Sequence, residues 1–162
     1  MPCDGCVAVF YEGLEGSRCF RIPTIIRTSR GTLLAFAENR VTDCGDDGPD
    51  HALVLRRSVD NGNSWGPLIE VQKDSEPPCD DCPSAISNPN PVEVTLGSAL
   101  HSTRAILLHY DTLNNPSEDR HGLGMQIWSY DDGLTWSTTA TVLAYPPQVT
   151  TRLSSEANNA KG

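Results

Sequence analysis

The sequence predicts an all-β fold built from two four-stranded antiparallel units. Short runs of β-branched and apolar residues recur between turns rich in Gly, Asp and Asn, which is typical of antiparallel sheets. No segment sustains the period that marks an amphipathic helix. One turn pattern occurs twice, which indicates a repeated unit. With 162 residues, the chain is long enough to bury a core.

The first unit follows a short lead-in over residues 1–19. We expect its strands at 22–28, 32–38, 51–58 and 67–72. Pro23 suits the beginning of a strand, because that position need not donate a hydrogen bond to the sheet. A turn at 29–31 makes the first two strands a hairpin, and a polar loop at 39–50 precedes the third.

The second unit repeats this order after a Pro-rich loop at 73–90. We expect its strands at 91–96, 103–110, 123–130 and 137–143. The final residues are polar with few apolar side chains, so we expect a disordered tail. The predicted organisation is a lead-in (1–19), an all-β domain (20–143) and a tail (144–162).

The repeated turn has the pattern S-x-D-x-G-x-[S/T]-W and falls between the third and fourth strand of each unit. Its marked residues are Ser58, Asp60, Gly62 and Trp65, and then Ser129, Asp131, Gly133 and Trp136. The Asp carboxylate can accept backbone N–H groups across the turn, Gly permits a positive φ, and Trp packs on the sheet. We interpret these residues as structural, and the repeated four-stranded units suggest blades of a β-propeller.

The charge and the absence of some motifs limit the possible partners. A net charge of -9 makes nucleic acid and anionic membrane surfaces poor partners. No apolar run reaches the ~18–20 residues of a membrane span, and no signal peptide is recognisable, so we expect a cytoplasmic protein. No cofactor motif is present, and the four histidines form no metal pattern.

The six cysteines leave two alternatives to a free-thiol protein. The pairs Cys3/Cys6 and Cys79/Cys82 each have C-x-x-C spacing, which permits a zinc-stapled structural module. In a reducing compartment free thiols are the default, and a disulfide becomes an alternative if the protein is exported. We therefore expect free thiols and no metal.

Several stretches resemble the N-terminal part of the exo-α-sialidase (neuraminidase) family. They are F-R-I-P at 20–23, L-A-F-A-E-N-R at 34–40, L-V-L-R-R-S at 53–58 and S-N-P-N-P-V at 87–92, together with the two eight-residue turns, known as Asp boxes. The resemblance covers about residues 19–143. It implies a six-bladed β-propeller, of which this chain contains about the first two blades.

The resemblance also implies site residues. Arg21 would be the first of three arginines that hold the substrate carboxylate in a two-bond fork, which lysine cannot form. Arg40 would be a further contact to sialic acid. Asp46 would be the general acid/base that protonates the glycosidic oxygen and then activates water. The interval from Arg40 favours Asp46, whereas counting back from Ser58 favours Asp47.

Two further residues are weaker candidates for substrate contact. Glu118 would contact the substrate as a loop glutamate does in some relatives, although a solvated acid explains it as well. Asn88 would border the pocket, or would simply open the strand before Pro89.

In the family, a tyrosine nucleophile, its glutamate and two more arginines lie in later blades. None of Tyr11, Tyr110, Tyr130 and Tyr145 has the corresponding context. We therefore expect an incomplete chain that is inactive alone. The parent enzyme would release terminal sialic acid from glycoproteins, oligosaccharides or glycolipids, as in ganglioside catabolism. The alternative is a non-catalytic Asp-box propeller that binds glycan or protein.

Overall fold

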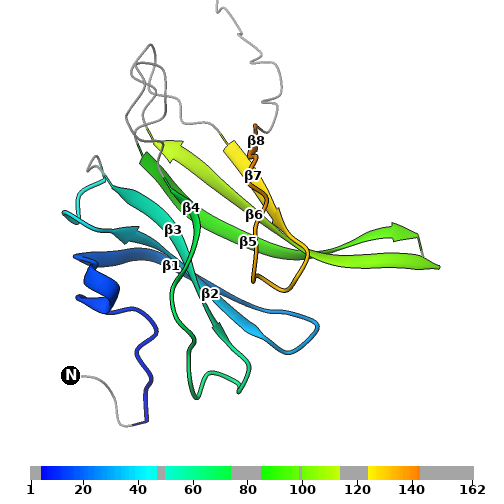
Figure 1. The fold of residues 1–162 in the computed structure, drawn as a ribbon, viewed down its shortest axis with the longest axis horizontal. Coiled ribbons are helices and arrows are strands. Elements are labelled where there is room, and N and C mark those ends of the chain that lie inside the picture. Colours follow the sequence, from blue (N-terminus) through cyan, green and yellow to red (C-terminus); the bar gives the residue numbers. More distant parts are fainter. Residues whose placement is uncertain (1–4, 47–49, 74–84, 99, 114–123, 143–162) are drawn as a thin grey trace, which may run out of the picture.

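Two four-stranded antiparallel sheets make up the computed structural model, which describes residues 5–46, 50–73, 85–98, 100–113 and 124–142 (Figure 1). The all-β prediction with two antiparallel units is confirmed, while closure into a propeller stays a prediction. The tail expected at 144–162 lies outside the described residues, as do Cys3, Cys79 and Cys82.

Each sheet keeps its strands in sequence order. The first contains β1 (Cys19–Arg27), β2 (Leu33–Arg40), β3 (His51–Ser58) and β4 (Ile69–Lys73). The second contains β5 (Ala85–Ser98), β6 (His101–Leu113), β7 (Gly124–Ser129) and β8 (Thr141–Val142). Within the described residues the one helical segment is a single 3-10 turn, Leu14–Gly16, so no described helix is long enough to span a bilayer.

The first strand of each sheet begins earlier than the sequence predicts. β1 starts at Cys19 rather than at residue 22, and β5 starts at Ala85 rather than at residue 91. Both strands contain a proline next to a one-residue bulge, between Arg21 and Thr24 in β1 and between Ser87 and Asn90 in β5. A bulge releases a residue from the ladder, so proline does not end the strand there.

The residue before the proline has a left-handed backbone in both bulges. Ile22 has a φ of 48° and Asn88 a φ of 57°. Asn tolerates this conformation, but it is unfavourable for β-branched Ile, so the surrounding sheet must hold Ile22 in place. The repeat therefore includes this bulged first strand as well as the Asp box.

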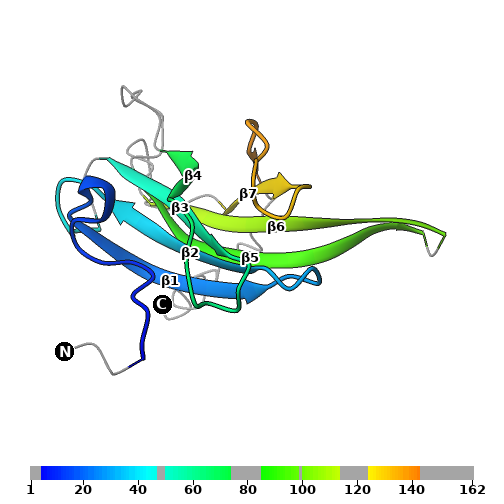
Figure 2. The same ribbon diagram turned by 60° about the horizontal axis from the view of Figure 1, so that its bottom comes forward.

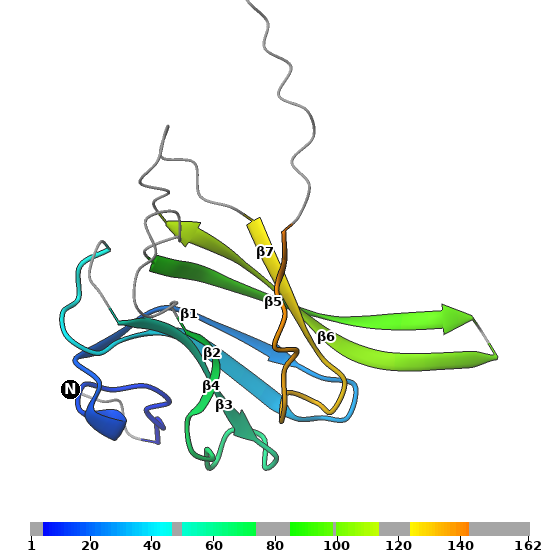
Figure 3. The ribbon, with the colours of Figure 1, turned by 45° about the horizontal axis from the view of Figure 1, so that its top comes forward.

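The main core lies between the two sheets. The first sheet contributes Leu34, Phe36, Leu53 and Leu55, and the second contributes Ile86, Ile106, Leu108, Tyr110 and Ile127. A smaller cluster covers the other face of the first sheet, where Phe10 and Phe20 pack on Ala37, Ala52 and Val54. Because β2 and β3 are covered on both faces, most of their side chains are buried, and residues 51–55 of β3 are buried one after another. Figures 2 and 3 show the second sheet lying across the first, with β5 next to β1 and β2.

The Asp boxes have the hydrogen bonds of a closed turn. Asp60 Oδ1 accepts from Ser64 N at 2.9 Å, and Oδ2 accepts from Ser64 Oγ at 2.6 Å. Asp131 accepts in the same way from the backbone and hydroxyl of Thr135, at 2.8 and 2.6 Å. Trp136 meets Phe36 of the first sheet edge to face, with ring centroids 5.8 Å apart.

The cysteine expectation needs a correction, because Cys19 and Cys44 form a disulfide. Cys19 pairs with Arg40 across β1 and β2, and the loop after Arg40 turns back over the strand end, which brings the two Cα atoms to 6.0 Å. Among the described cysteines there is no free thiol. A disulfide is uncommon in the reducing cytosol, so this bond does not favour the cytoplasmic expectation, which stays a prediction.

Candidate active site

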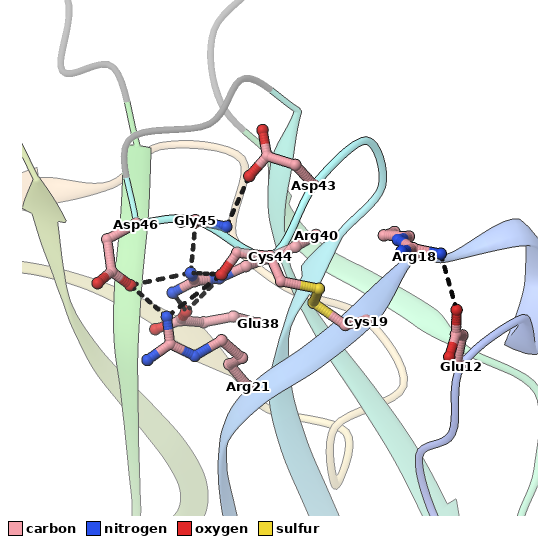
Figure 4. Close-up of a disulfide and its surroundings, with 10 residues drawn as sticks. All are labelled: Glu12, Arg18, Cys19, Arg21, Glu38, Arg40, Asp43, Cys44, Gly45 and Asp46. Atoms are coloured by element: carbon pink, nitrogen blue, oxygen red, sulfur yellow. Dashed lines mark hydrogen bonds and ion pairs between the residues drawn. A yellow bond between two sulfur atoms is a disulfide. The ribbon is translucent and has the colours of Figure 1, made fainter.

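Arg21 lies near the N-terminal end of β1, beside the loop that carries Asp46 (Figure 4). Its backbone pairs with Glu38 of β2, just before the bulge. The Arg21 side chain is 40% exposed, so a ligand can reach its guanidinium. Its NH1 group donates to Asp46 Oδ1 at 2.6 Å and, at the longer distance of 3.4 Å, to the Cys44 carbonyl.

Arg40 ends β2, and its guanidinium is inaccessible to solvent, with only 1% of the side chain exposed. Both Nε, at 3.0 Å, and NH2 donate to Glu38 Oε2. Its NH1 group donates to the carbonyls of Cys44 and Gly45 and lies 2.9 Å from Asp46 Oδ1. All three nitrogens of the guanidinium thus interact with protein groups. The loop that follows Arg40 contacts the guanidinium through Cys44, Gly45 and Asp46.

Glu38 connects this cluster to the second sheet. Its carboxylate is fully buried, and Oε1 accepts from Ser87 Oγ at 2.5 Å and from the backbone N–H of Asn88 at 2.9 Å. Ser87 is the last paired residue before the bulge of β5, and Asn88 lies in the bulge. A buried carboxylate is stable when it is paired with a cation and its remaining lone pairs are hydrogen-bonded, and Glu38 meets both conditions.

Asp46 has the most exposed carboxylate in this cluster, with 62% of its side chain accessible. The hydrogen bond from Arg40 and the charge of Arg21 hold the pKa of Asp46 below its ordinary value. The Asp43 carboxylate shapes the same loop, because it accepts from the Gly45 N–H at 2.6 Å. In the state described here Asp46 is therefore an ionised carboxylate held between two arginines.

His51 adds a buried titratable group at the start of β3, opposite Arg40 in the sheet register. Burial, followed by the positive charge of Arg40, lowers the pKa of His51, so the imidazole is neutral at pH 7. Its neutrality leaves Glu38 as the buried counter-charge of Arg40.

The structure gathers some of the residues predicted from the sequence and leaves others apart. Arg21, Arg40 and Asp46 share one cluster, and Asn88 lies beside it, exposed, with its side-chain amide 3.2 Å from Asp111 Oδ2. Asp47 and Glu118 lie outside the described residues. A direct contact between Arg40 and substrate stays a prediction, since its side chain is buried here.

Sequence reasoning missed Glu38, whose carboxylate links Arg40 of β2 to Ser87 and Asn88 of β5. The available signal was an acid that ends the apolar run 34–37, two residues before an arginine on the same face of the strand. The Cys19–Cys44 disulfide was also missed, although it ties the Asp46 loop to the strand that carries Arg21 (Figure 4).

The described tyrosines make no hydrogen bond to Arg21, Arg40, Glu38 or Asp46, whose bonds go to other groups. Tyr110 is buried in the core, where burial raises its pKa to about 12. Tyr130 stacks on Trp128, and Tyr11 lines a cavity beside the N-terminal segment. Among the described residues, the cluster thus exposes the Asp46 carboxylate and the Arg21 guanidinium to solvent, and it contains no phenol.

Comparison with known proteins gives partial matches to sialidases. A sialidase of Micromonospora viridifaciens is 40% identical over 55 residues, which are 34% of this chain and 8% of that protein. The solved structure of Hadza microbial sialidase Hz136 has a TM-score of 0.63 at 23% identity, and covers 83% of this chain. No family model matches the sequence.

The chain spans 28% of the length of the sialidase structure and less of the curated relative. The structural likeness shows the fold, which is that of part of a sialidase. The sequence match supports a relationship to sialidases over about a third of the chain.

Proposed function

We propose that this cluster is part of the active site of an exo-α-sialidase, a glycoside hydrolase that releases terminal sialic acid from sialylated glycoconjugates. The observation that carries the proposal is the solvent-accessible pair of Arg21 and Asp46, whose NH1 and Oδ1 atoms lie 2.6 Å apart. It combines a carboxylate-binding cation with a carboxyl group beside it. The partial match to sialidases supports the same reading.

Arg21 would bind the carboxylate of sialic acid, since a planar guanidinium offers two parallel N–H donors to a carboxylate. The backbone pairing of Arg21 with Glu38 fixes the base of this side chain. A cation held in a fixed position, such as Arg21, favours the binding of sugars with an anionic substituent over neutral sugars.

Asp46 would protonate the glycosidic oxygen as the bond breaks and would then activate water. Its exposure allows contact with a leaving group, and Arg40 orients it from the buried side. Asp47 remains the alternative acid for this role.

Turnover requires a nucleophile that the described residues do not supply. Sialidases use a tyrosine in this role, and Tyr11, Tyr110 and Tyr130 make no hydrogen bond to the cluster. We therefore propose that later blades of a six-bladed propeller complete the site, and that the 162-residue chain binds ligand without hydrolysing it.

The test is calorimetric binding of an unsaturated sialic acid analogue to the full chain and to Arg21→Lys. We expect the substitution to weaken binding about tenfold or more, because lysine cannot form the two-bond fork. Arg18→Lys is the matched control, since Arg18 is exposed, three residues upstream, and paired only with Glu12 in the described interactions. Equal affinity of the two variants would contradict the role of Arg21. Hydrolysis of a fluorogenic sialoside by the purified chain would contradict the need for later blades.

A further inference from the structure

Arg21 already holds a carboxylate in this structure. Its NH1 group bonds Asp46 Oδ1 at 2.6 Å, although both side chains are accessible, at 40% and 62%. A ligand carboxylate that takes both terminal nitrogens of Arg21 needs this NH1 group. Two carboxylates at one guanidinium also repel each other. The ligand and Asp46 therefore compete for the same atoms.

We propose that Asp46 is an internal carboxylate ligand of Arg21, and that a carboxylate-bearing substrate binds Arg21 by displacing it. The inference rests on the proposed function, which supplies the substrate carboxylate. It adds that occupation of Arg21 and release of Asp46 are one coupled event.

Arg40 does not compete with Arg21 for the incoming ligand. Its side chain is 1% exposed, and Glu38 neutralises its charge from the buried side. Arg40 NH1 lies 2.9 Å from the same Asp46 Oδ1 atom, and the Cys19–Cys44 disulfide ties the loop to β1, so neither connection depends on Arg21. The displaced carboxyl group thus stays beside the ligand instead of leaving with a mobile loop.

Displacement from Arg21 raises the proton affinity of Asp46. Within the described residues, the charged and titratable groups that surround it are Arg21, Arg40, Glu38, Asp43 and His51. Losing the Arg21 contact removes one group that lowers the pKa of Asp46, and the ligand's negative charge raises that pKa further. Asp46 becomes easier to protonate when substrate is present, which is what a general acid requires.

The experiment compares binding of the unsaturated sialic acid analogue to the full chain, Asp46→Asn and Asp43→Asn. Both substitutions remove one negative charge from the same loop and keep the size of the side chain. Only Asp46 contacts Arg21, whereas Asp43 accepts from the Gly45 N–H. We expect Asp46→Asn to bind about three- to fivefold more tightly than Asp43→Asn.

The outcomes separate this proposal from the proposed function. If the native chain binds and Asp46→Asn binds no more tightly than Asp43→Asn, displacement is overturned while the function stands. If neither the native chain nor Asp46→Asn binds, the function fails and displacement fails with it. Binding that is detected in Asp46→Asn but not in the native chain or Asp43→Asn supports both.

A second measurement tests the internal pair without any sugar. The carboxyl carbon resonance of Asp46, followed by NMR against pH, reports its pKa directly. We expect that pKa to rise in Arg21→Gln, and to rise in the native chain when the analogue is added. An unchanged pKa in Arg21→Gln would overturn the internal pair, whatever the analogue does.

Discussion

Glu38 is the residue on which the geometry of the cluster depends most. One carboxylate oxygen accepts from Arg40, and the other accepts from Ser87 and Asn88 of the second sheet. The sequence alone does not predict this role, because a glutamate within a strand is usually a solvated residue on the polar face. Arg21 was proposed from the F-R-I-P motif and Asp46 from its interval to Arg40, whereas the partners of Glu38 in the second sheet are 49 and 50 residues away in sequence.

Replacing Glu38 with Gln is therefore expected to destabilise the protein by about 3–5 kcal/mol, because the buried Arg40 charge loses its counter-charge. The measurement is chemical denaturation at neutral pH. Glu12→Gln is the control, since the Glu12–Arg18 pair is 71% and 61% exposed and should contribute less than about 1 kcal/mol. Similar losses in the two variants would show that Glu38 is not a buried counter-ion in solution.

At the scale of the elements, the sequence predicts the Asp boxes but not the bulges in the first strands. The turn pattern predicts its own hydrogen bonds, because Asp60, Ser64 and Ser58 meet within seven residues of sequence. The bulges were not predicted, since Pro23 and Pro89 each indicate an end or a beginning of a strand. Only the register against the neighbouring strand shows that the ladder continues past them.

The first Asp box gives a prediction on pH. Hydrogen bonds from the side chain and backbone of Ser64 lower the pKa of Asp60 from 3.8 to about 2. Because the folded-state pKa is below the unfolded value, the ionised carboxylate stabilises the fold fully above about pH 4. This contribution is lost as the pH falls toward 2.

The difference in melting temperature between the native chain and Asp60→Asn should thus be constant near neutrality and shrink between about pH 4 and pH 2. Thermal unfolding across this range measures it. A difference that stays the same down to about pH 2 would contradict the role of the carboxylate.

At the scale of the whole molecule, the second Asp box joins the two sheets. Asp132 Oδ2 accepts from Thr32 at 2.5 Å and from Arg57 at 3.2 Å, both in the first sheet or at its edge. Gly133 follows, and a Cβ there would come within 3.1 Å of Leu55 and 3.3 Å of Leu34. The sequence predicts two sheets but not this contact between them. The eight-residue pattern allows any residue at the position of Asp132, so the pattern does not indicate a contact there.

Asp132→Ala should therefore cost about 1–3 kcal/mol more than Asn61→Ala. The two positions correspond in the two boxes and both have a positive φ, 64° and 58°, so the backbone cost of alanine cancels in the comparison. Asn61 is exposed, and its side chain makes no hydrogen bond within the described part of the chain, whereas the Asp132 side chain is 8% exposed and is paired with Arg57. Equal losses in denaturant titrations would argue against a contact between the sheets at Asp132.

The Cys19–Cys44 disulfide has a practical consequence for every binding measurement. It covalently joins the strand that carries the arginine to the loop that carries the acid. Dithiothreitol, a routine additive in purification buffers, cuts this connection by thiol–disulfide exchange. Affinities measured with and without it therefore describe two chemically different proteins, and Figure 4 shows the arrangement of Arg21 and Asp46 in the oxidised one.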